Sequence, residues 1–275
     1  MNIASDALQP SPETTREVAA WITPVARIGF IAKGVVYLLL GWFAVRAAFL
    51  ADEPLDRSEA LAHLRDQDFG DLVLFAIALG LVAHVLWRLT QAVFDPEHAG
   101  DRKLHLGPRL FHLGGAAFYG ALAWTAWELG EGAHEQHDRE DHWMGVLLSQ
   151  PFGRLLAYGV GAAIIGYGLR QFWRAWKGSP VTRHLALERV RQHALIAVIG
   201  RFGVAARGVV FLLIGGFVLD AAHDFDATAA GSTDEALRAL GHGWMLGIVA
   251  TGLVAYGLFQ FCEARWHRIH PGQRG

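Results

Sequence analysis

The chain has 275 residues, of which 53% are hydrophobic and 18% are charged, and its formal net charge is −2. This balance excludes an ordinary soluble domain, in which about a quarter of the residues are charged. The apolar residues gather in stretches of the length that crosses a bilayer, which takes about 20 helical residues. Six stretches qualify, at roughly 28–50, 72–94, 110–128, 153–173, 202–222 and 243–262. The sequence therefore predicts an all-α membrane protein with six transmembrane helices.

Residues 1–24 precede the first span and are predicted to form a cytoplasmic tail. Ser11-Pro12-Glu13 has the features of a helix start, with a serine cap and a proline in the first turn. The tail is therefore either a short helix lying at the membrane interface or a partly disordered segment. No cleaved signal peptide is expected, because the first apolar stretch is too long for one. The single cysteine, Cys262, is interpreted as a packing residue.

The first span is repeated later in the chain. Residues 27–48 return as residues 201–222, with 12 of the 22 positions identical. Both copies read Arg-x-Gly-x-x-Ala-(Lys/Arg)-Gly-Val-Val-aromatic-Leu-Leu, and Gly34 and Gly41 recur in the second copy. Small residues at steps of seven form one helix face, which lets another membrane helix approach closely.

The third span is a weaker copy of the first. Arg109 and Tyr119 match Arg27 and Tyr37, but the two glycines become Ala116 and Ala123.

The second span of each unit recurs as well. Gly80-Leu81-Val82-Ala83 returns at residues 252–255, and the pattern Tyr-Gly-Leu-x-Gln-Phe occurs at 167–172 and at 256–261. Between the spans, Glu59-Ala60-Leu61-x-x-Leu64 returns at 235–240 and predicts a short amphipathic outer helix. The chain thus divides into a tail (1–24), repeat 1 (25–97), repeat 2 (98–178), a cytoplasmic basic linker helix (179–200), repeat 3 (201–268) and a second tail (269–275).

Charge predicts the orientation of the spans. If both termini lie inside, 18 of the 24 Lys and Arg residues fall on the inner side and 18 of the 26 acids fall outside. Lys and Arg favour the cytoplasmic side. Both termini are therefore predicted to be cytoplasmic in a bacterial plasma membrane. This topology already explains the basic inner loops, so no nucleic-acid partner is predicted.

A unit of two helices begins and ends on the same side of the membrane, so successive repeats enter it in the same direction. Such parallel repeats are related by an axis along the membrane normal. The predicted fold is a bundle of three two-helix repeats around a pseudo-threefold axis.

The chain combines the three helix pairs, the Arg-x-Gly-x-x-Ala-(Arg/Lys)-Gly opening, the Gln-Pro-Phe-Gly turn at 150–153 and the Tyr-Gly-x-x-Gln ending. In these features it resembles a bacterial membrane family known as domain of unknown function 1206. The resemblance covers about residues 20–268. It departs at the first helix of repeat 2, and at His84, where the family has tyrosine. The resemblance implies a six-helix bacterial membrane protein and no activity, so no functional residue is carried over.

The second spans share a polar stripe at i, i+4 and i+7, which lies on one helix face. Lys33 and Arg207 add positive charge about six residues into the first and fifth spans. Ionisable groups inside a span usually face the bundle interior or a wet cavity. We therefore predict ligand-binding residues that line a cytoplasm-facing cavity for an anionic solute or lipid head group: Lys33, His84, Arg88, Tyr167, Gln171, Arg207, Tyr256 and Gln260. Alternatively, Lys33 and Arg207 extend to the inner interface and touch anionic lipid.

Two classes of function follow. The first is transport or binding of an anion in that cavity. The alternative is a non-catalytic scaffold or partner subunit, whose protein partners meet the outer acidic segments or the inner basic linker. An enzyme acting on lipid or quinone has least support, because the sequence has no phosphate-binding loop and no protease or hydrolase motif. No cofactor is predicted.

Histidine is abundant, with 14 residues. His84 and His112 differ in depth by roughly 10 Å at 1.5 Å per residue, which disfavours a haem pair. In the outer loop of repeat 2, His134, His137 and His142 alternate with carboxylates and could bind zinc, nickel or copper. Their spacing matches no known metal site, so a solvated acidic loop is the alternative.

Overall fold

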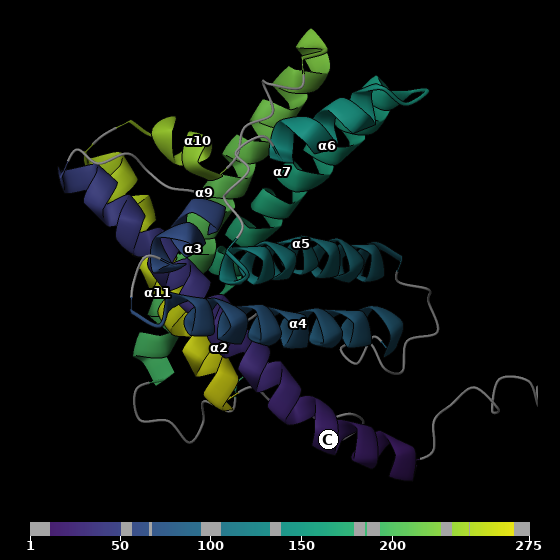
Figure 1. Cartoon of the computed structure of the whole chain (residues 1–275), viewed down its shortest axis with the longest axis vertical. Coiled ribbons are helices and arrows are strands. Elements are labelled where there is room, and N and C mark those ends of the chain that lie inside the picture. Colours follow the sequence, from purple (N-terminus) through teal and green to yellow (C-terminus); the bar gives the residue numbers. More distant parts are fainter. Residues whose placement is uncertain are drawn as a thin grey trace, which may run out of the picture.

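The computed structural model describes residues 12–50, 57–65, 68–94, 106–132, 139–178, 185, 193–226, 233–241 and 243–266. Over this part of the chain the residues form nine helices (Figure 1). In chain order these are α2 (Pro12–Leu50), α3 (Arg57–Arg65), α4 (Gly70–Phe94), α5 (Leu106–Gly130), α6 (Arg139–Leu148), α7 (Gly153–Lys177), α9 (His193–Asp224), α10 (Thr233–Arg238) and α11 (Trp244–Trp266). The expected all-helical class is confirmed for these residues.

Four helices are long and apolar enough to cross a membrane. The candidate spans are Thr23–Leu50 in α2, Gly70–Val93 in α4, Ala194–Asp224 in α9 and Trp244–Trp266 in α11. The chain is therefore a multi-pass membrane protein. α5 and α7 have 25 residues each, as α4 does, but they carry fewer Leu, Ile and Val residues and are less apolar. α5 and α7 were also predicted to cross the membrane, but their apolar content alone does not identify them as membrane-spanning helices.

Two of the long helices begin earlier than the sequence predicted. α2 starts at Pro12, so the helix expected within the first tail continues into the first span. Proline suits this position, because the first turn of a helix needs no backbone N–H donor. α9 starts at His193, so the last part of the predicted linker helix belongs to the first helix of repeat 3. Of residues 179–192, Leu185 is described, and it is buried.

Each second helix is preceded by a short helix. α3 and α10 were predicted, whereas α6 was not. Each of them buries one large apolar side chain completely: Leu61 in α3, Met144 in α6 and Leu237 in α10. These side chains anchor the short helices on the ends of the long ones, because burial of a large apolar side chain contributes about 1.5–3 kcal/mol.

A tight turn joins the short helix to the long one in repeats 1 and 2. Phe69 and Phe152 have positive φ angles of 62° and 64° and are about 80% exposed. The next residues, Gly70 and Gly153, lie directly against carbonyl oxygens at the end of the short helix, where a Cβ atom would collide. This close approach explains the Phe-Gly sequence of both turns.

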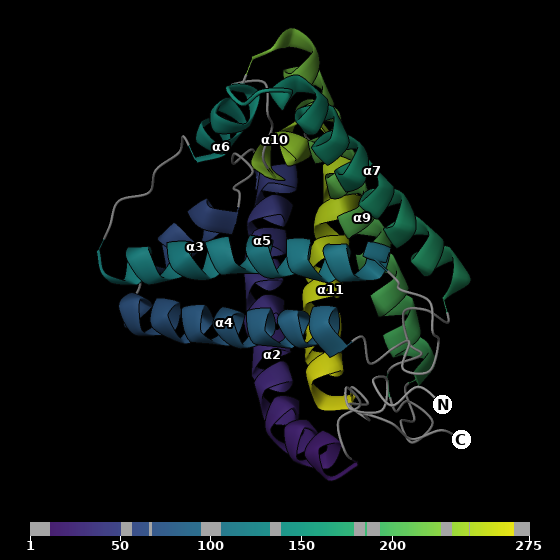
Figure 2. The same cartoon turned by 90° about the vertical axis from the view of Figure 1, so that its right-hand side faces the viewer.

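The long helices form three pairs that join neighbouring repeats. α4 packs on α5, α7 packs on α9, and α11 packs on α2. Figure 2 shows the α4–α5 pair crossing the α2–α11 pair steeply, with α7 and α9 inclined beside them. α2 also contacts α4, and α9 also contacts α11, but α5 and α7 do not pack closely over their described residues.

The predicted face of small residues is the one used in these pairs. A Cβ atom on Gly34 would lie 3.1 Å from the carbonyl oxygen of Gly257 in α11, and one on Gly41 would lie 2.7 Å from the backbone nitrogen of Val254. In α9, Gly208 lies in the same way against Gly168 of α7. The prediction that this face receives another helix is confirmed.

Candidate functional site

Three aromatic ring pairs lie at the centre of the molecule, one in each helix pair. Each joins the second helix of one repeat to the first helix of the next. All three are edge-to-face with ring centroids 4.7 Å apart, an arrangement that aromatic rings favour. The pairs are His84 with Tyr119, Tyr167 with Phe211, and Tyr256 with Tyr37.

Arg207 of α9 lies among these rings and is only 5% exposed. Its Nε–H donates to the Tyr37 hydroxyl at 2.8 Å, and Nη1 donates to the Tyr256 hydroxyl at 2.9 Å. Nη2 reaches the Tyr119 hydroxyl at 3.4 Å, and the Tyr167 ring lies 5.3 Å from Cζ. Arg207 therefore connects helices of all three repeats, and its charge is stabilised by tyrosine hydroxyls and ring faces.

Lys33 of α2 is the counterpart of Arg207 in repeat 1 and is 3% exposed. Its Nζ lies 5.1 Å from the ring centroid of Tyr256 and 5.5 Å from that of Tyr119. Lys33 and Arg207 thus sit inside the helix packing, enclosed by aromatic rings. The predicted anion cavity and the alternative contact of Lys33 and Arg207 with anionic lipid both stay predictions.

Several buried polar atoms near Lys33 have no hydrogen-bond partner. They are both ring nitrogens of His84, both amide atoms of Gln260, and Nε of Arg88. His84 and Gln260 are completely buried. Unpaired buried polar groups are rare and costly, and they often mark an unseen water or ion. We name Lys33, His84, Arg88 and Gln260 together the Lys33 site.

Arg88 of α4 differs from the rest of the Lys33 site because it lies at the α4–α5 contact. Its Nη1 lies 3.0 Å from Nδ1 of His112 on α5 and donates to Oε1 of Gln91 at 3.4 Å. A Cβ atom on Gly115 of α5 would lie 3.6 Å from Arg88 Nε. In the repeat alignment Gly115 is the counterpart of Lys33 and Arg207, so Arg88 brings positive charge to the interface whose first helix lacks it.

The central charges are predominantly positive. Lys33 interacts electrostatically with Arg207, Arg88 and Arg174, which carry its own sign, and with Glu263, which is its one acidic partner in this set. Arg174 donates to Gln171, and Gln171 donates to the Tyr167 hydroxyl at 3.1 Å. An anion in the Lys33 site would reduce the repulsion among these buried cations.

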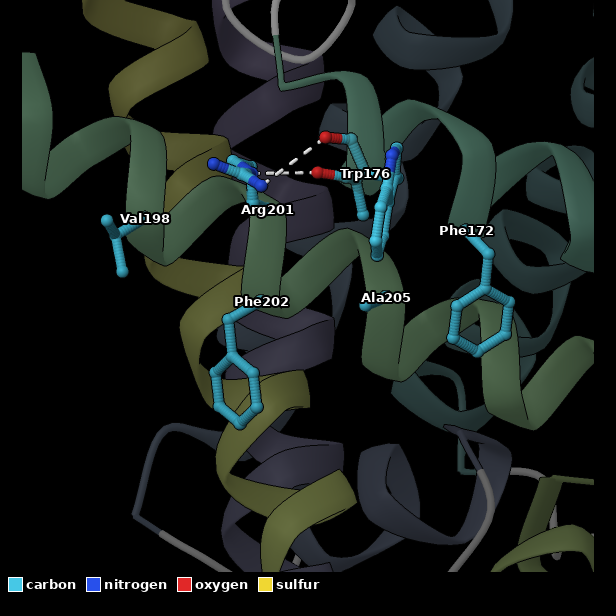
Figure 3. Close-up of a pocket in the computed structure, with 7 residues that line it drawn as sticks. Phe172, Trp176, Val198, Arg201, Phe202 and Ala205 are labelled. Carbon is cyan, nitrogen blue, oxygen red and sulfur yellow. Dashed lines mark hydrogen bonds between the residues drawn. The ribbon is translucent and has the colours of Figure 1, made fainter.

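A shallow groove with a volume of about 370 Å³ lies elsewhere, between α7 and α9 (Figure 3). Its walls are mainly apolar, from Phe172, Ala175, Trp176, Val198, Phe202 and Ala205. Its charged lining residue, Arg201, donates to the carbonyl oxygens of Ala175 at 2.7 Å and Trp176 at 3.4 Å. Arg201 therefore caps the end of α7.

The predicted metal ligands fall outside what the structure describes. His134 and His137 lie in the undescribed segment 133–138, and the side chain of His142, in α6, is not described either. Among the described residues, no group of three or more His, Cys, Asp or Glu side chains could hold a metal ion.

The eight predicted ligand-binding residues gather at the centre but fall into two groups. Arg207, Tyr167, Tyr256 and Gln171 bond to one another or to other tyrosines, whereas Lys33, His84, Arg88 and Gln260 include the unpartnered atoms. The centre also includes four residues that were not predicted from the sequence: Tyr37, Tyr119, His112 and Gly115. The alignment of Tyr119 with Tyr37 was the available signal for the two tyrosines.

The model of the family described as Domain of Unknown Function (DUF1206) matches three times, over residues 28–95, 112–178 and 202–267. The chain is also 32% identical over 259 residues to the uncharacterized protein YxxB of Bacillus subtilis (strain 168). The aligned region covers 92% of this chain and 94% of that protein. No solved structure matches.

Proposed function

Because the chain belongs to the DUF1206 family, whose description assigns no activity, we propose from its own residues that it binds an anionic group at the Lys33 site. The observation that carries the proposal is the set of unpartnered polar atoms on His84, Gln260 and Arg88 around a buried lysine. Lysine, arginine, a side-chain amide and an imidazole N–H can all donate hydrogen bonds to a carboxylate or a phosphate. An anion would satisfy donors that otherwise cost free energy.

We also propose that all six long helices span a bacterial plasma membrane around a pseudo-threefold axis, with both termini in the cytoplasm. The three equivalent ring pairs support the symmetry. Exposed large apolar side chains on the two less apolar helices support spanning, since they would face lipid: Leu113, Phe118, Trp124 and Trp127 on α5, and Leu155, Leu156, Leu169, Trp173 and Trp176 on α7.

Topology can be tested with cysteine labelling. Cys262 is the only natural cysteine, so Cys262→Ala provides a cysteine-free background. Single cysteines at Ser149, before α7, and at Lys177, at its end, are expected to react with a membrane-impermeant maleimide from opposite sides. Labelling of both from one side would show that α7 does not span.

Anion binding can be tested with radiolabelled inorganic phosphate on protein purified in mild detergent. Lys33→Met keeps the length of the side chain and removes its charge, and we expect the affinity for phosphate to fall by about tenfold or more, which corresponds to 1.4 kcal/mol. Lys177→Met is the matched control, because Lys177 is exposed at the end of α7. Equal phosphate binding by wild type and Lys33→Met would contradict the proposal.

A structural scaffold is the second candidate, favoured by the hydrogen bonds that join Arg207 to tyrosines of three repeats. On this alternative the centre needs no ligand. Replacement of a buried charge by an apolar side chain is then neutral or stabilising, as in other proteins with buried charges. Lys33→Met would leave the unfolding temperature in detergent unchanged or raise it, without any change in phosphate binding.

A further inference from the structure

In repeats 1 and 3, a glycine on the first long helix lets it pack closely against the second long helix of the same repeat. A Cβ atom on Gly29 of α2 would lie 2.6 Å from Cα of His84 in α4. One on Gly203 of α9 would lie 2.5 Å from Cα of Tyr256 in α11. Only glycine allows the backbones to approach so closely. Repeat 2 has no glycine at the corresponding position, which is occupied by Phe111.

The neighbouring positions of repeat 2 remain open. Ala32 is buried against Gly80 in repeat 1, but its counterpart on α5, Gly114, is exposed and a Cβ there would meet nothing within 4 Å. Ala163 on α7, the counterpart of Gly80, is exposed as well. Phe118 is 40% exposed where Val36, its counterpart, is 1% exposed. We name these exposed faces of α5 and α7, two helices that do not pack closely on each other, the repeat 2 seam.

The seam leads to the central cations. Tyr167 of α7 is half-buried, and its ring lies 5.3 Å from Arg207 Cζ. On the other side, Gly115 follows Gly114 and lies beside Arg88. The seam also has a positive charge at its exposed surface, because Arg170 is exposed whereas its counterpart in repeat 1, Trp87, is buried.

The composition of the seam suits a lipid better than a dissolved ion. The apolar ring of Phe118 is 40% exposed on this face, so a hydrated ion that approached along it would have to pass an apolar group. Gly114 is eight residues from the start of α5, and Tyr167 is ten residues from the end of α7. At 1.5 Å per residue, Gly114 lies about 12 Å along α5 from its start and Tyr167 about 15 Å along α7 from its end, so each lies near the middle of its helix.

We propose that the repeat 2 seam admits an anionic membrane lipid sideways from the bilayer. Its head group faces Arg170 and the Lys33 site, to which Arg88 belongs, and an acyl chain lies along Phe118. This inference rests on the proposed anion binding and names the class of ligand. It also accounts for the exposure of Gly114 and Arg170, whose counterparts in repeat 1 are buried.

The test compares lipid retention with phosphate binding. Wild-type protein is placed in nanodiscs of phosphatidylglycerol and phosphatidylcholine, extracted gently, and analysed by native mass spectrometry. Gly114→Leu and Gly166→Leu fill the seam at positions where a Cβ meets nothing within 4 Å. Gly216→Leu is the matched control, since Gly216 is equally open but lies on α9.

We expect wild type and Gly216→Leu to retain phosphatidylglycerol, and the double seam variant to lose it by about tenfold or more while it still binds inorganic phosphate. Lys33→Met should lose both ligands. If the seam variant retains the lipid, or if phosphatidylcholine is retained equally well, lateral entry of an anionic lipid is wrong. If phosphate binds in a Lys33-dependent way and no lipid is retained, the ligand is a soluble anion and only this inference fails. If neither binds, the proposed function fails as well.

Discussion

Arg88 of α4 and Gly115 of α5 face each other across one helix pair, with 3.6 Å between Arg88 Nε and the position of a Cβ atom on Gly115. In the repeat alignment the corresponding residues at the other two pairs are Gln171 with Arg207 and Gln260 with Lys33. At these two aligned positions each interface thus has one cation, which comes from the second helix in the α4–α5 pair and from the first helix in the other two pairs. The positive charge at each interface is therefore retained even though the sequence positions are not.

This relationship predicts a rescue. Arg88→Gln should weaken phosphate binding by about tenfold, because it removes a donor and a charge. Adding Gly115→Arg should restore most of the binding, since it recreates the Gln–Arg arrangement of the α7–α9 pair at a position where a Cβ atom makes only ordinary contact with residue 88. Radiolabelled phosphate binding checks both variants. If the double variant unfolds at the wild-type temperature but does not regain phosphate binding, then phosphate binding depends on which helix carries the arginine.

The tyrosines around Arg207 should contribute to stability in the order of their hydrogen-bond lengths. Tyr37→Phe leaves the buried Arg207 Nε–H without its 2.8 Å acceptor, and we expect a loss of about 1–2 kcal/mol in the free energy of unfolding. Tyr119→Phe should cost less, because its hydrogen bond is 3.4 Å long. Thermal unfolding in detergent gives the comparison. Tyr158→Phe, at an exposed contact with His223, serves as control, and a larger effect of Tyr119→Phe than of Tyr37→Phe would contradict this order.

Glycine substitutions should separate the closed contacts from the open seam. Gly29→Ala places a methyl group 2.6 Å from the His84 backbone and should destabilise the fold by about 1–3 kcal/mol. Gly114→Ala meets no neighbour and should stabilise it by about 0.5–1 kcal/mol, because alanine favours the helix. Denaturation of both variants in the same detergent is the measurement. A destabilising Gly114→Ala would show that the seam is packed.

Arg201 should stabilise the α7–α9 pair as a cap. Arg201→Gln removes the donors to the Ala175 and Trp176 carbonyl oxygens, and we expect a loss of about 1 kcal/mol in the free energy of unfolding. Phosphate binding should not change, because the groove that Arg201 lines is separate from the Lys33 site. Arg27→Gln at the exposed counterpart in repeat 1 is the control. Reduced phosphate binding in Arg201→Gln would contradict the assignment of a purely capping role.

Much of the architecture could be predicted from local patterns. The apolar stretches and the internal repeat predicted an all-helical, three-repeat membrane protein, and the glycine spacing of Gly34 and Gly41 predicted a face for close helix contact. Such features depend only on the order of residues within one helix. Lys33, Arg88 and Arg207 could be selected in the same way, because an ionisable side chain inside an apolar stretch is visible without knowledge of its neighbours.

The tertiary structure alone decided which helices meet. The small-residue face of α2 receives α11, which is about 200 residues away in the chain, and Tyr37 reaches Arg207 across 170 positions. The structure also decided that Arg207 is satisfied by tyrosines whereas His84 and Gln260 have no partner. The physical reason is that hydrogen bonds, ring contacts and burial depend on side chains brought together from different repeats. A repeat pattern shows which positions are equivalent. Only the packing shows that Arg88 of α4 lies beside Gly115, at the position where the other two repeats have Lys33 and Arg207.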